Sequence, residues 1–251
     1  MLTTVVECHA GSWSMKIGLI GYGKMGKEIE QQISKTGHEI TAIYSSERLF
    51  LADSSPDCDV FIEFSIPSAV ESHIEHAIQL QKPIVIGTTG WYDSLPQIKT
   101  LIGNNIGCVY SGNFSPGIHI MKKLVAELSK NLSSIGGYDI SMIEKHHRHK
   151  KDSPSGTAHL LGSAVIEHFA GKEYITTSPE EILQTTKALH ISSMRCGDII
   201  GEHEIIADSI IDSISISHTA KNRTGFAQGA ILAAEWIEHK KGLHEFSEFF
   251  S

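Results

Sequence analysis

The fold of this chain is decided first by the stretch Ile17-Gly18-Leu19-Ile20-Gly21-Tyr22-Gly23-Lys24-Met25-Gly26. A short apolar strand runs into a Gly-x-Gly-x-x-Gly turn, and apolar residues then recur at helical spacing as far as Gly37. In this strand–turn–helix setting Gly21 permits the tight turn, Gly23 lets the backbone approach a pyrophosphate, and Gly26 lets the helix pack on the strand. The helix N-terminus directs its partial positive charge at the phosphates. The stretch therefore predicts dinucleotide binding, with an ordinary glycine-rich turn as the alternative.

The sequence that follows alternates short apolar strands with segments of helix length. Such strands are typical of a parallel sheet that is covered by helices on both faces. The further strands are expected at 40–44, 60–64, 83–87 and 106–110. The predicted fold class of this half is therefore an α/β Rossmann dinucleotide-binding domain.

Further cofactor contacts are expected where the strands end, because ligands of open α/β sheets bind beyond the carboxyl ends of the strands. Ser45 and Ser46 end the second strand in place of the acidic residue that would favour NAD. Serines do not exclude a 2'-phosphate, so the predicted cofactor is NADPH or NADH. The residues that end the fourth and fifth strands are also candidates: Gly87, Thr88, Thr89, Ser111, Gly112, Asn113 and Phe114.

The second half of the chain has a different pattern. Ser115-Pro116 is a helix start, and helical periodicity continues to Gly136-Gly137. Beyond a strand over 138–143 and a helix capped by Ser155, the pattern becomes strand-like, and period-two alternation predicts a strand over 210–218. These features predict a smaller α+β domain with a mixed or antiparallel sheet. The expected boundaries are 15–115 with 224–251 for the dinucleotide-binding domain, and 116–223 for a substrate-binding and oligomerisation domain.

Composition excludes several classes of protein. The 251 residues are 41% hydrophobic and 20% charged, with a net charge of −8, so we expect a globular protein with no nucleic-acid partner. No apolar run reaches the roughly 20 residues that cross a bilayer, so no membrane partner is expected. The widely spaced cysteines indicate reduced thiols and a cytoplasmic location. Residues 1–14 lack a regular pattern and a signal-peptide composition, and we expect a disordered or non-native leader.

A second distinctive segment is Glu144-Lys145-His146-His147-Arg148-His149-Lys150-Lys151-Asp152-Ser153-Pro154-Ser155-Gly156-Thr157. It combines three imidazoles and four permanent cations with the start of a helix-patterned run. This combination suits a small anionic substrate that must also receive a proton. The candidate carboxylate-binding residues are His147, Lys150, Ser155, Gly156 and Thr157, and either His146 or Lys150 supplies the proton.

Two other interpretations of this segment are less consistent with it. The adjacent lysines and arginine would repel a divalent cation, and no carboxylate-rich ligand set is near, so no metal is expected. A nucleic-acid surface usually interleaves aromatic residues with its basic ones, and this single basic run lacks them.

The spacing Glu144-x-His146-His147-Arg148-His149-Lys150-x-Asp152-x-Pro154-Ser155-Gly156-Thr157-Ala158 resembles the signature of the 4-hydroxy-tetrahydrodipicolinate reductase family. The resemblance extends through 21–26, 87–90, 113–115 and 195–203, and covers about 15–246. Lys24 stands where the family commonly has arginine. Ser45 and Ser46 stand where many members carry an acidic–basic pair.

The resemblance implies an oxidoreductase of diaminopimelate and lysine biosynthesis that uses NADPH or NADH to reduce a small cyclic dicarboxylate. It implies that His146 donates or accepts a proton and that Lys150 donates one, with His147, Gly156 and Thr157 contacting the substrate. It also implies a homotetramer assembled through the sheet of the second domain. The implied cofactor contacts are Gly21, Tyr22, Gly23, Lys24, Met25, Gly26, 87–89 and 111–114.

Two alternative functions follow from the same sequence. A nucleotide-sensing module could keep this fold without catalysis, although a sensor has no use for the proton donors His146 and Lys150. Another two-domain dehydrogenase, acting on aspartate or homoserine, would not need the cationic histidine-rich segment.

Overall fold

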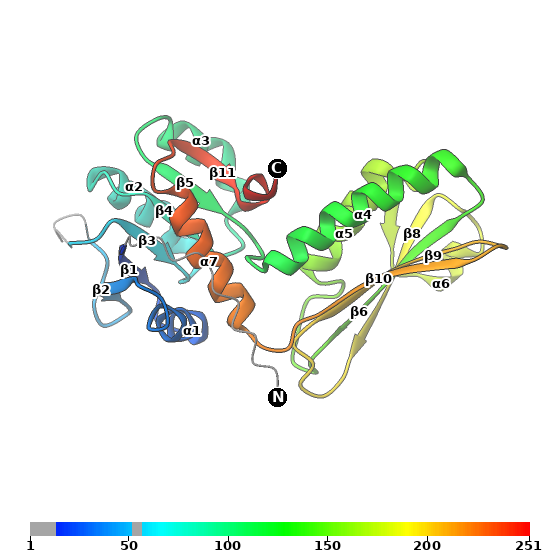
Figure 1. Cartoon of the computed structure of the whole chain (residues 1–251), viewed down its shortest axis with the longest axis horizontal. Helices are drawn as coiled ribbons and strands as arrows, with labels where there is room; N and C mark the ends of the chain where they lie inside the picture. The colour runs from blue at the N-terminus through cyan, green and yellow to red at the C-terminus, as the bar shows by residue number, and fades with distance from the viewer. Residues whose placement is uncertain (1–13, 52–56) are drawn as a thin grey trace. The chain divides into compact units, whose positions relative to one another are not determined.

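The computed structural model describes residues 14–51 and 57–251, so residues 1–13 of the expected leader lie outside the described residues. The chain divides into two compact units, the first comprising Met1–Phe114 with Phe226–Ser251 and the second Ser115–Gly225. Figure 1 shows both units. Among the described helices, none has the length and apolar character that crossing a membrane requires.

The first unit is built on a six-stranded sheet in which every pairing is parallel. Its strand order is β11-β5-β4-β3-β1-β2, so the chain winds outward in both directions from β1 and β3. The strands are β1 (Lys16–Ile20), β2 (Glu39–Tyr44), β3 (Val60–Glu63), β4 (Ile84–Ile86), β5 (Gly107–Tyr110) and β11 (Gly242–Glu245).

Two buried clusters cover the two faces of this sheet. Helices α1 (Lys24–Ile33) and α7 (Thr224–Ile237) contribute to one cluster, and α2 (Val70–Gln79) and α3 (Leu95–Ile102) contribute to the other. Three short 3-10 helices complete the unit: η1 (Pro67–Ala69), η2 (Tyr92–Ser94) and η3 (Phe246–Phe250). The predicted α/β Rossmann fold is therefore confirmed. Strand β11 was not predicted, because its four half-buried residues carry no regular alternation.

The second unit has a five-stranded sheet in the order β10-β9-β6-β8-β7. Strand β8 pairs in parallel with β6 and β7, whereas β9 pairs antiparallel with β6 and β10, so the sheet is mixed. Its elements in chain order are α4 (Pro116–Ile135), β6 (Asp139–His146), α5 (Gly156–His168), β7 (Tyr174–Thr176), α6 (Pro179–Ile182), β8 (Ala188–Arg195), β9 (Glu202–Asp208) and β10 (Ser213–Thr219).

Helices α4 and α5 pack on one face of this sheet and bury its apolar side chains. The predicted strand over 210–218 begins only at Ser213, because residues 209–212 form the turn from β9 to β10. Strand β8 was missed in the sequence, since its second half is polar and largely exposed. Its parallel pairing with β6 is the feature that matters for function. It brings the carboxyl ends of β6 and β8, at His146 and Arg195, to the same edge of the sheet.

Candidate active site

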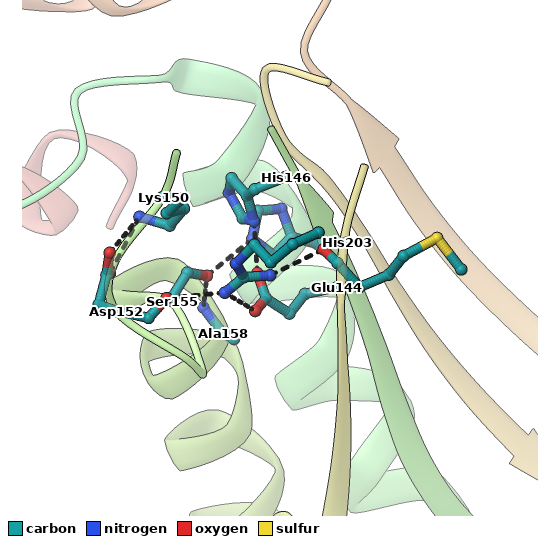
Figure 2. Close-up of polar contacts among 9 residues, drawn as sticks. Glu144, His146, Lys150, Asp152, Ser155, Ala158 and His203 are labelled. Carbon is teal, nitrogen blue, oxygen red and sulfur yellow. Dashed lines mark hydrogen bonds and ion pairs between the residues drawn. The ribbon is translucent and has the colours of Figure 1, made fainter. Parts of the chain in front are cut away.

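The last buried residues of β6 form the centre of the candidate active site. Glu144 and His146 lie two residues apart, so both side chains point to the face that α4 and α5 cover. Strand register then gives each of them a cross-strand partner: His146 pairs with Arg195 on β8, and Glu144 pairs with His203 on β9. Three neighbouring strands therefore bring the four side chains together. Figure 2 labels three of them, Glu144, His146 and His203.

Glu144 is fully buried, and each of its oxygens has a nitrogen partner. Its Oε1 accepts a hydrogen bond of 2.7 Å from Nη2 of Arg195, and its Oε2 lies 2.5 Å from Nδ1 of His146. Burial favours the neutral acid, but hydrogen bonds from Ser193 and Arg195 and the charges of His146 and Arg195 outweigh it. The pKa of Glu144 is therefore lowered, and the group is a carboxylate at neutral pH.

His146 is buried and is neutral at pH 7. Burial and the charges of Lys150 and Arg195 outweigh the attraction of Glu144, so the pKa of His146 is lowered. Because Nδ1 faces the Glu144 carboxylate, the ring proton belongs on Nδ1 and Nε2 is left to exchange protons. A methyl group added at Gly201 would lie 3.1 Å from this Nε2. Glycine at position 201 therefore leaves room for the reactive edge of the ring.

His203 lies beside His146 and is more deeply buried. Its Nε2 is 3.2 Å from Oγ of Ser155, and its ring meets that of His146 edge to face, with 5.2 Å between the centroids. Burial is the main cause of a lowered pKa for His203, and repulsion from His146 is the second cause. Together they lower the pKa of His203 to about 3. His203 is therefore a neutral imidazole throughout the physiological range.

The loop from β6 to α5 is tied to β8. Arg195 Nη2 donates a second hydrogen bond, of 2.7 Å, to the backbone oxygen of Asp152. The backbone amide of Cys196 donates to the oxygen of His146 at 2.9 Å, and that of Arg148 donates to the oxygen of Gly197 at 3.1 Å. One arginine thus connects the buried carboxylate to the loop that carries Lys150.

Lys150 and the start of α5 converge on a carboxylate, that of Asp152. Lys150 Nζ lies 2.9 Å from the carboxylate oxygens. Burial opposes ionisation of Asp152, but hydrogen bonds from Lys150 and from the backbone amide of Gly156 contribute to a lowered pKa. At the same helix start, Ser155 Oγ accepts a hydrogen bond of 3.1 Å from the amide of Ala158. This arrangement is suited to binding an anion.

The other charges of the histidine-rich segment face elsewhere. Lys145 lies on the opposite face of β6 and pairs with Glu202 at 3.0 Å. Arg148, His149 and Lys151 are exposed, and the half-buried ring of His147 lies 6.5 Å from that of His149. Of the candidate substrate residues, Lys150 and Gly156 both contact Asp152, and Ser155 contacts His203 and caps α5. Thr157 follows in the first turn of α5.

One cluster in the described part of the chain has the donors that a metal would use. The potential ligand atoms of Glu144, His146 and His203 lie within 4.8 Å of one another. Arg195 already pairs with the carboxylate and compensates its charge. A divalent cation there would lie against this guanidinium, so the donor set does not suit a metal ion.

The first unit contains a cavity of about 430 Å³ at the carboxyl edge of its sheet. Five predicted cofactor residues line it: Gly21, Tyr22, Gly23, Ser45 and Ser46. Residues not predicted from the sequence complete the wall: Ile20, Tyr44, Leu49, Phe50, Phe64, Ser65, Ile66, Ala69 and His73. The short run from Phe64 to Ala69 follows β3, so the rule that ligands bind at strand ends would have found it.

The glycines of the first turn fit a pyrophosphate. A Cβ at Gly21 would lie 2.1 Å from the backbone oxygen of Phe64, and one at Gly26 would lie 2.3 Å from that of Gly21. Gly21 also has a φ of +92°, which favours glycine. Beside Gly23 no described heavy atom lies within 4 Å of such a Cβ. The backbone at Gly23 is thus open to a phosphate, whereas the other two glycines serve the turn itself.

The remaining predicted cofactor residues differ in exposure. Lys24 is exposed, and Met25 packs against the core. Thr88 Oγ1 accepts from the amide of Ser65 at 2.7 Å, so it joins the loops after β3 and β4. The side chain of Phe114 is buried in the apolar core, 4.9 Å from Phe246 between centroids, so only its backbone is available to a ligand.

The other members of the two later loops lie at strand ends as expected. Gly87 leaves space for the ring of Phe64, which a Cβ would meet at 2.1 Å. Gly112 lies beside Thr89, whose methyl group would be 3.9 Å from a Cβ at that glycine. Ser111 Oγ donates to the backbone oxygen of Asn113 at 2.7 Å. The loops after β4 and β5 therefore meet, although the described cavity does not include them.

We expect the free energy of unfolding to fall as the pH is lowered from 6.5 to 4.5. The pKa of His203 lies below its ordinary value only in the folded chain, so the unfolded chain binds this proton more tightly and stability is lost on acidification. The lowered pKa values of His146 and His218 act in the same direction. For His203 alone the slope is about 1.4 kcal/mol per pH unit. Urea unfolding at several pH values should give a shallower dependence for His203→Gln, and an unchanged slope would contradict the assignment.

Comparison with known proteins finds relatives that match nearly the whole chain. Residues 15–114 match the family model described as dihydrodipicolinate reductase, N-terminus, and residues 117–250 match the model of its C-terminus. A 4-hydroxy-tetrahydrodipicolinate reductase of Zymomonas mobilis is 34% identical over 94% of this chain and 96% of its own length. One of Rickettsia bellii is 36% identical over 94% of each chain.

A solved structure shares the fold. It is a dipicolinate-bound dihydrodipicolinate reductase from Paenisporosarcina sp. TG-14, with a TM-score of 0.77 and 23% identity over 94% of this chain and 99% of that one. The two family models between them cover nearly the whole described chain. The chain therefore belongs to the dihydrodipicolinate reductase family.

Proposed function

We propose that this chain catalyses the NAD(P)H-dependent reduction of 4-hydroxy-tetrahydrodipicolinate to tetrahydrodipicolinate in diaminopimelate and lysine biosynthesis. The observation that carries the proposal is the convergence of Lys150 Nζ and the Gly156 amide on one carboxylate, close to the neutral, buried His146. The names of the relatives supply the substrate and the reaction. We assign nucleotide binding to the first unit and substrate binding to the second.

The substrate is a cyclic dicarboxylate, and its carboxylates suit the donors around α5. A substrate carboxylate has the same charge and geometry as that of Asp152, which Lys150 and the Gly156 amide already bind. The helix N-terminus adds its partial positive charge. We assign His147, Ser155 and Thr157 to the same site as further substrate contacts.

The proton steps are assigned to two side chains. Bound NAD(P)H would supply a hydride to the ring, and the 4-hydroxyl group of the substrate leaves as water. Lys150 donates the proton that balances the incoming hydride. His146 exchanges a proton through Nε2, while Glu144 holds its Nδ1 and stabilises the imidazolium whenever it forms. Arg195 keeps Glu144 ionised and in place.

The assay that tests this function follows NAD(P)H absorbance while aspartate semialdehyde, pyruvate and the upstream synthase generate the substrate. We expect cofactor oxidation that depends on this chain. Absence of oxidation with both NADPH and NADH would contradict the proposed function and would favour the sensing module.

We assign the adenosine end of the cofactor to the cavity beside Gly23. We propose that this cavity accepts both NADPH and NADH. Among its described lining residues none is acidic, so nothing there repels a 2'-phosphate, and Ser45 and Ser46 offer hydroxyl groups to either ribose. Comparison of kcat/KM for the two cofactors tests this assignment. A difference above about a hundredfold would show that one of them is excluded.

Gly23→Ala is expected to raise the KM for NAD(P)H by roughly tenfold or more while leaving the Tm close to that of the unmodified chain. The new methyl group would enter open space in the folded chain and would occupy the position that a pyrophosphate must approach. Gly26→Ala is the matched contrast, since its Cβ would meet backbone at 2.3 Å and should lower the Tm. An unchanged KM for Gly23→Ala would remove the turn from the cofactor site.

Assembly is assigned to the sheet of the second unit, and we propose a homotetramer. The face opposite α4 and α5 carries Met194, which is half exposed, and a polar hollow of about 200 Å³ that includes Lys145 and Glu202. Sedimentation of the full chain should give four copies, and Met194→Glu should reduce that number. A cytoplasmic location stays a prediction.

A further inference from the structure

His203 is the most deeply buried histidine of the active-site network, and it has no part in the proton steps assigned above. It is 4% exposed and lies between Ser155 and His146. We propose that His203 is a positioning residue that holds the carboxylate-binding start of α5 and the imidazole of His146 in one fixed arrangement. The proposal rests on the proposed function of the same site.

Ser155 links His203 to the start of α5. Its hydroxyl is buried and has two neighbours: the Ala158 amide, which donates to Oγ at 3.1 Å, and His203 Nε2, at 3.2 Å. A serine hydroxyl has one proton and two acceptor positions, so these two contacts together fix its rotamer. The fixed rotamer keeps the cap on α5, and the cap keeps the amides of Gly156 and Thr157 directed towards an anion.

His203 also packs against the ring of His146, the residue that exchanges a proton. His203 stands opposite Glu144 in the strand register, and its ring meets the His146 ring edge to face at 5.2 Å. Gly201 closes in on the same ring from the backbone side. His146 is therefore confined by Glu144 at Nδ1, by His203 at its side and by Gly201 near Nε2. Removing one of these three neighbours gives the ring new rotamers.

The charge state of His203 suits this role. Burial lowers its pKa most, and the charges of His146, His218 and Lys150 act in the same direction. Only Glu144 opposes them. A neutral ring does not add a cation beside His146, so it leaves the proton affinity of that ring to Glu144, Lys150 and Arg195. In Figure 2 His203 lies between the ends of Ser155 and His146, next to Glu144.

The test compares two replacements of His203 that differ in reach. The side-chain amide of glutamine extends to the position of Nε2 and keeps a hydrogen bond to Ser155, whereas that of asparagine ends near Nδ1 and cannot reach it. The probe is dipicolinate, a flat dicarboxylate, measured by calorimetry on the full chain with NADPH present. We expect His203→Asn to weaken dipicolinate binding by about tenfold, the scale of one buried hydrogen bond, and His203→Gln to recover most of it.

A second readout separates positioning from a general loss of structure. We expect the imidazole ¹⁵N signals of His146 to broaden or shift in His203→Asn, while the KM for NADPH, which depends on the first unit, stays within about twofold. Ser155→Ala should weaken dipicolinate binding at least as much as His203→Asn does, because Ser155 is also assigned as a substrate contact. The double variant should bind dipicolinate no more weakly than Ser155→Ala alone, since His203 acts through Ser155.

Each outcome decides the proposal. Wild-type dipicolinate affinity in His203→Asn, equal losses in the asparagine and glutamine variants, or additive losses in the double variant would each overturn it. Failure of the proposed function has a different signature, because wild type would then oxidise no NAD(P)H in the coupled assay. The His146 signals of the protein alone report the coupling even in that case.

Discussion

Lys150→Ala is expected to lower kcat by about a hundredfold or more, the scale of one general acid. Lys150 lies in the β6–α5 loop, and its Nζ is 2.9 Å from the carboxylate oxygens of Asp152. The substitution removes both a donor to the substrate carboxylate and the proton that balances hydride addition. We therefore expect KM for the dicarboxylate to rise as well, while KM for NAD(P)H is unchanged.

Two control variants make this result specific to proton donation. Lys150→Arg keeps the positive charge but holds its proton too tightly to donate it, so it should recover substrate KM more than kcat. Lys151→Ala removes an adjacent exposed lysine and should leave both constants within about twofold. Steady-state kinetics with saturating cofactor measure all three. A turnover in Lys150→Ala equal to that of wild type would remove Lys150 from the chemistry.

His146→Gln is expected to lower kcat by about 10²- to 10³-fold. The amide fills much of the same space but cannot exchange a proton, and it cannot form the imidazolium that Glu144 would stabilise. Because the pKa of His146 is lowered, its titration should limit the wild-type rate on the acid side, below pH 6.5. That limb of the pH profile should be absent from the variant.

His149→Gln is the matched control for His146, since it makes the same change at an exposed histidine of the same segment. Its kcat should stay close to that of wild type. The two variants are compared by kcat over pH 5 to 9 and by thermal unfolding. Retention of the acid limb in His146→Gln would assign that limb to another group and contradict the role of His146.

The sequence was sufficient for five of the six strands of the first unit because local signals there coincide. Strand, glycine turn and helix follow one another within Ile17–Ile33, and each is favoured by its own residues. In the second unit the mixed sheet was predicted only as a class. Strands β7 and β8 lack a regular pattern, and their places are set by the packing of α5 against the sheet rather than by local preference.

By itself the sequence determined the chemistry of the site: the cationic segment, the candidate proton donors His146 and Lys150, and the start of α5. The alternation of β6 already placed Glu144 on the same face as His146, although its role was not recognised. Only the tertiary structure decided their partners, because the register of β6 with β8 and β9 brings Arg195 and His203 from more than 45 residues away. Pairings between distant strands depend on packing across the whole sheet, and no local pattern around β6 encodes them.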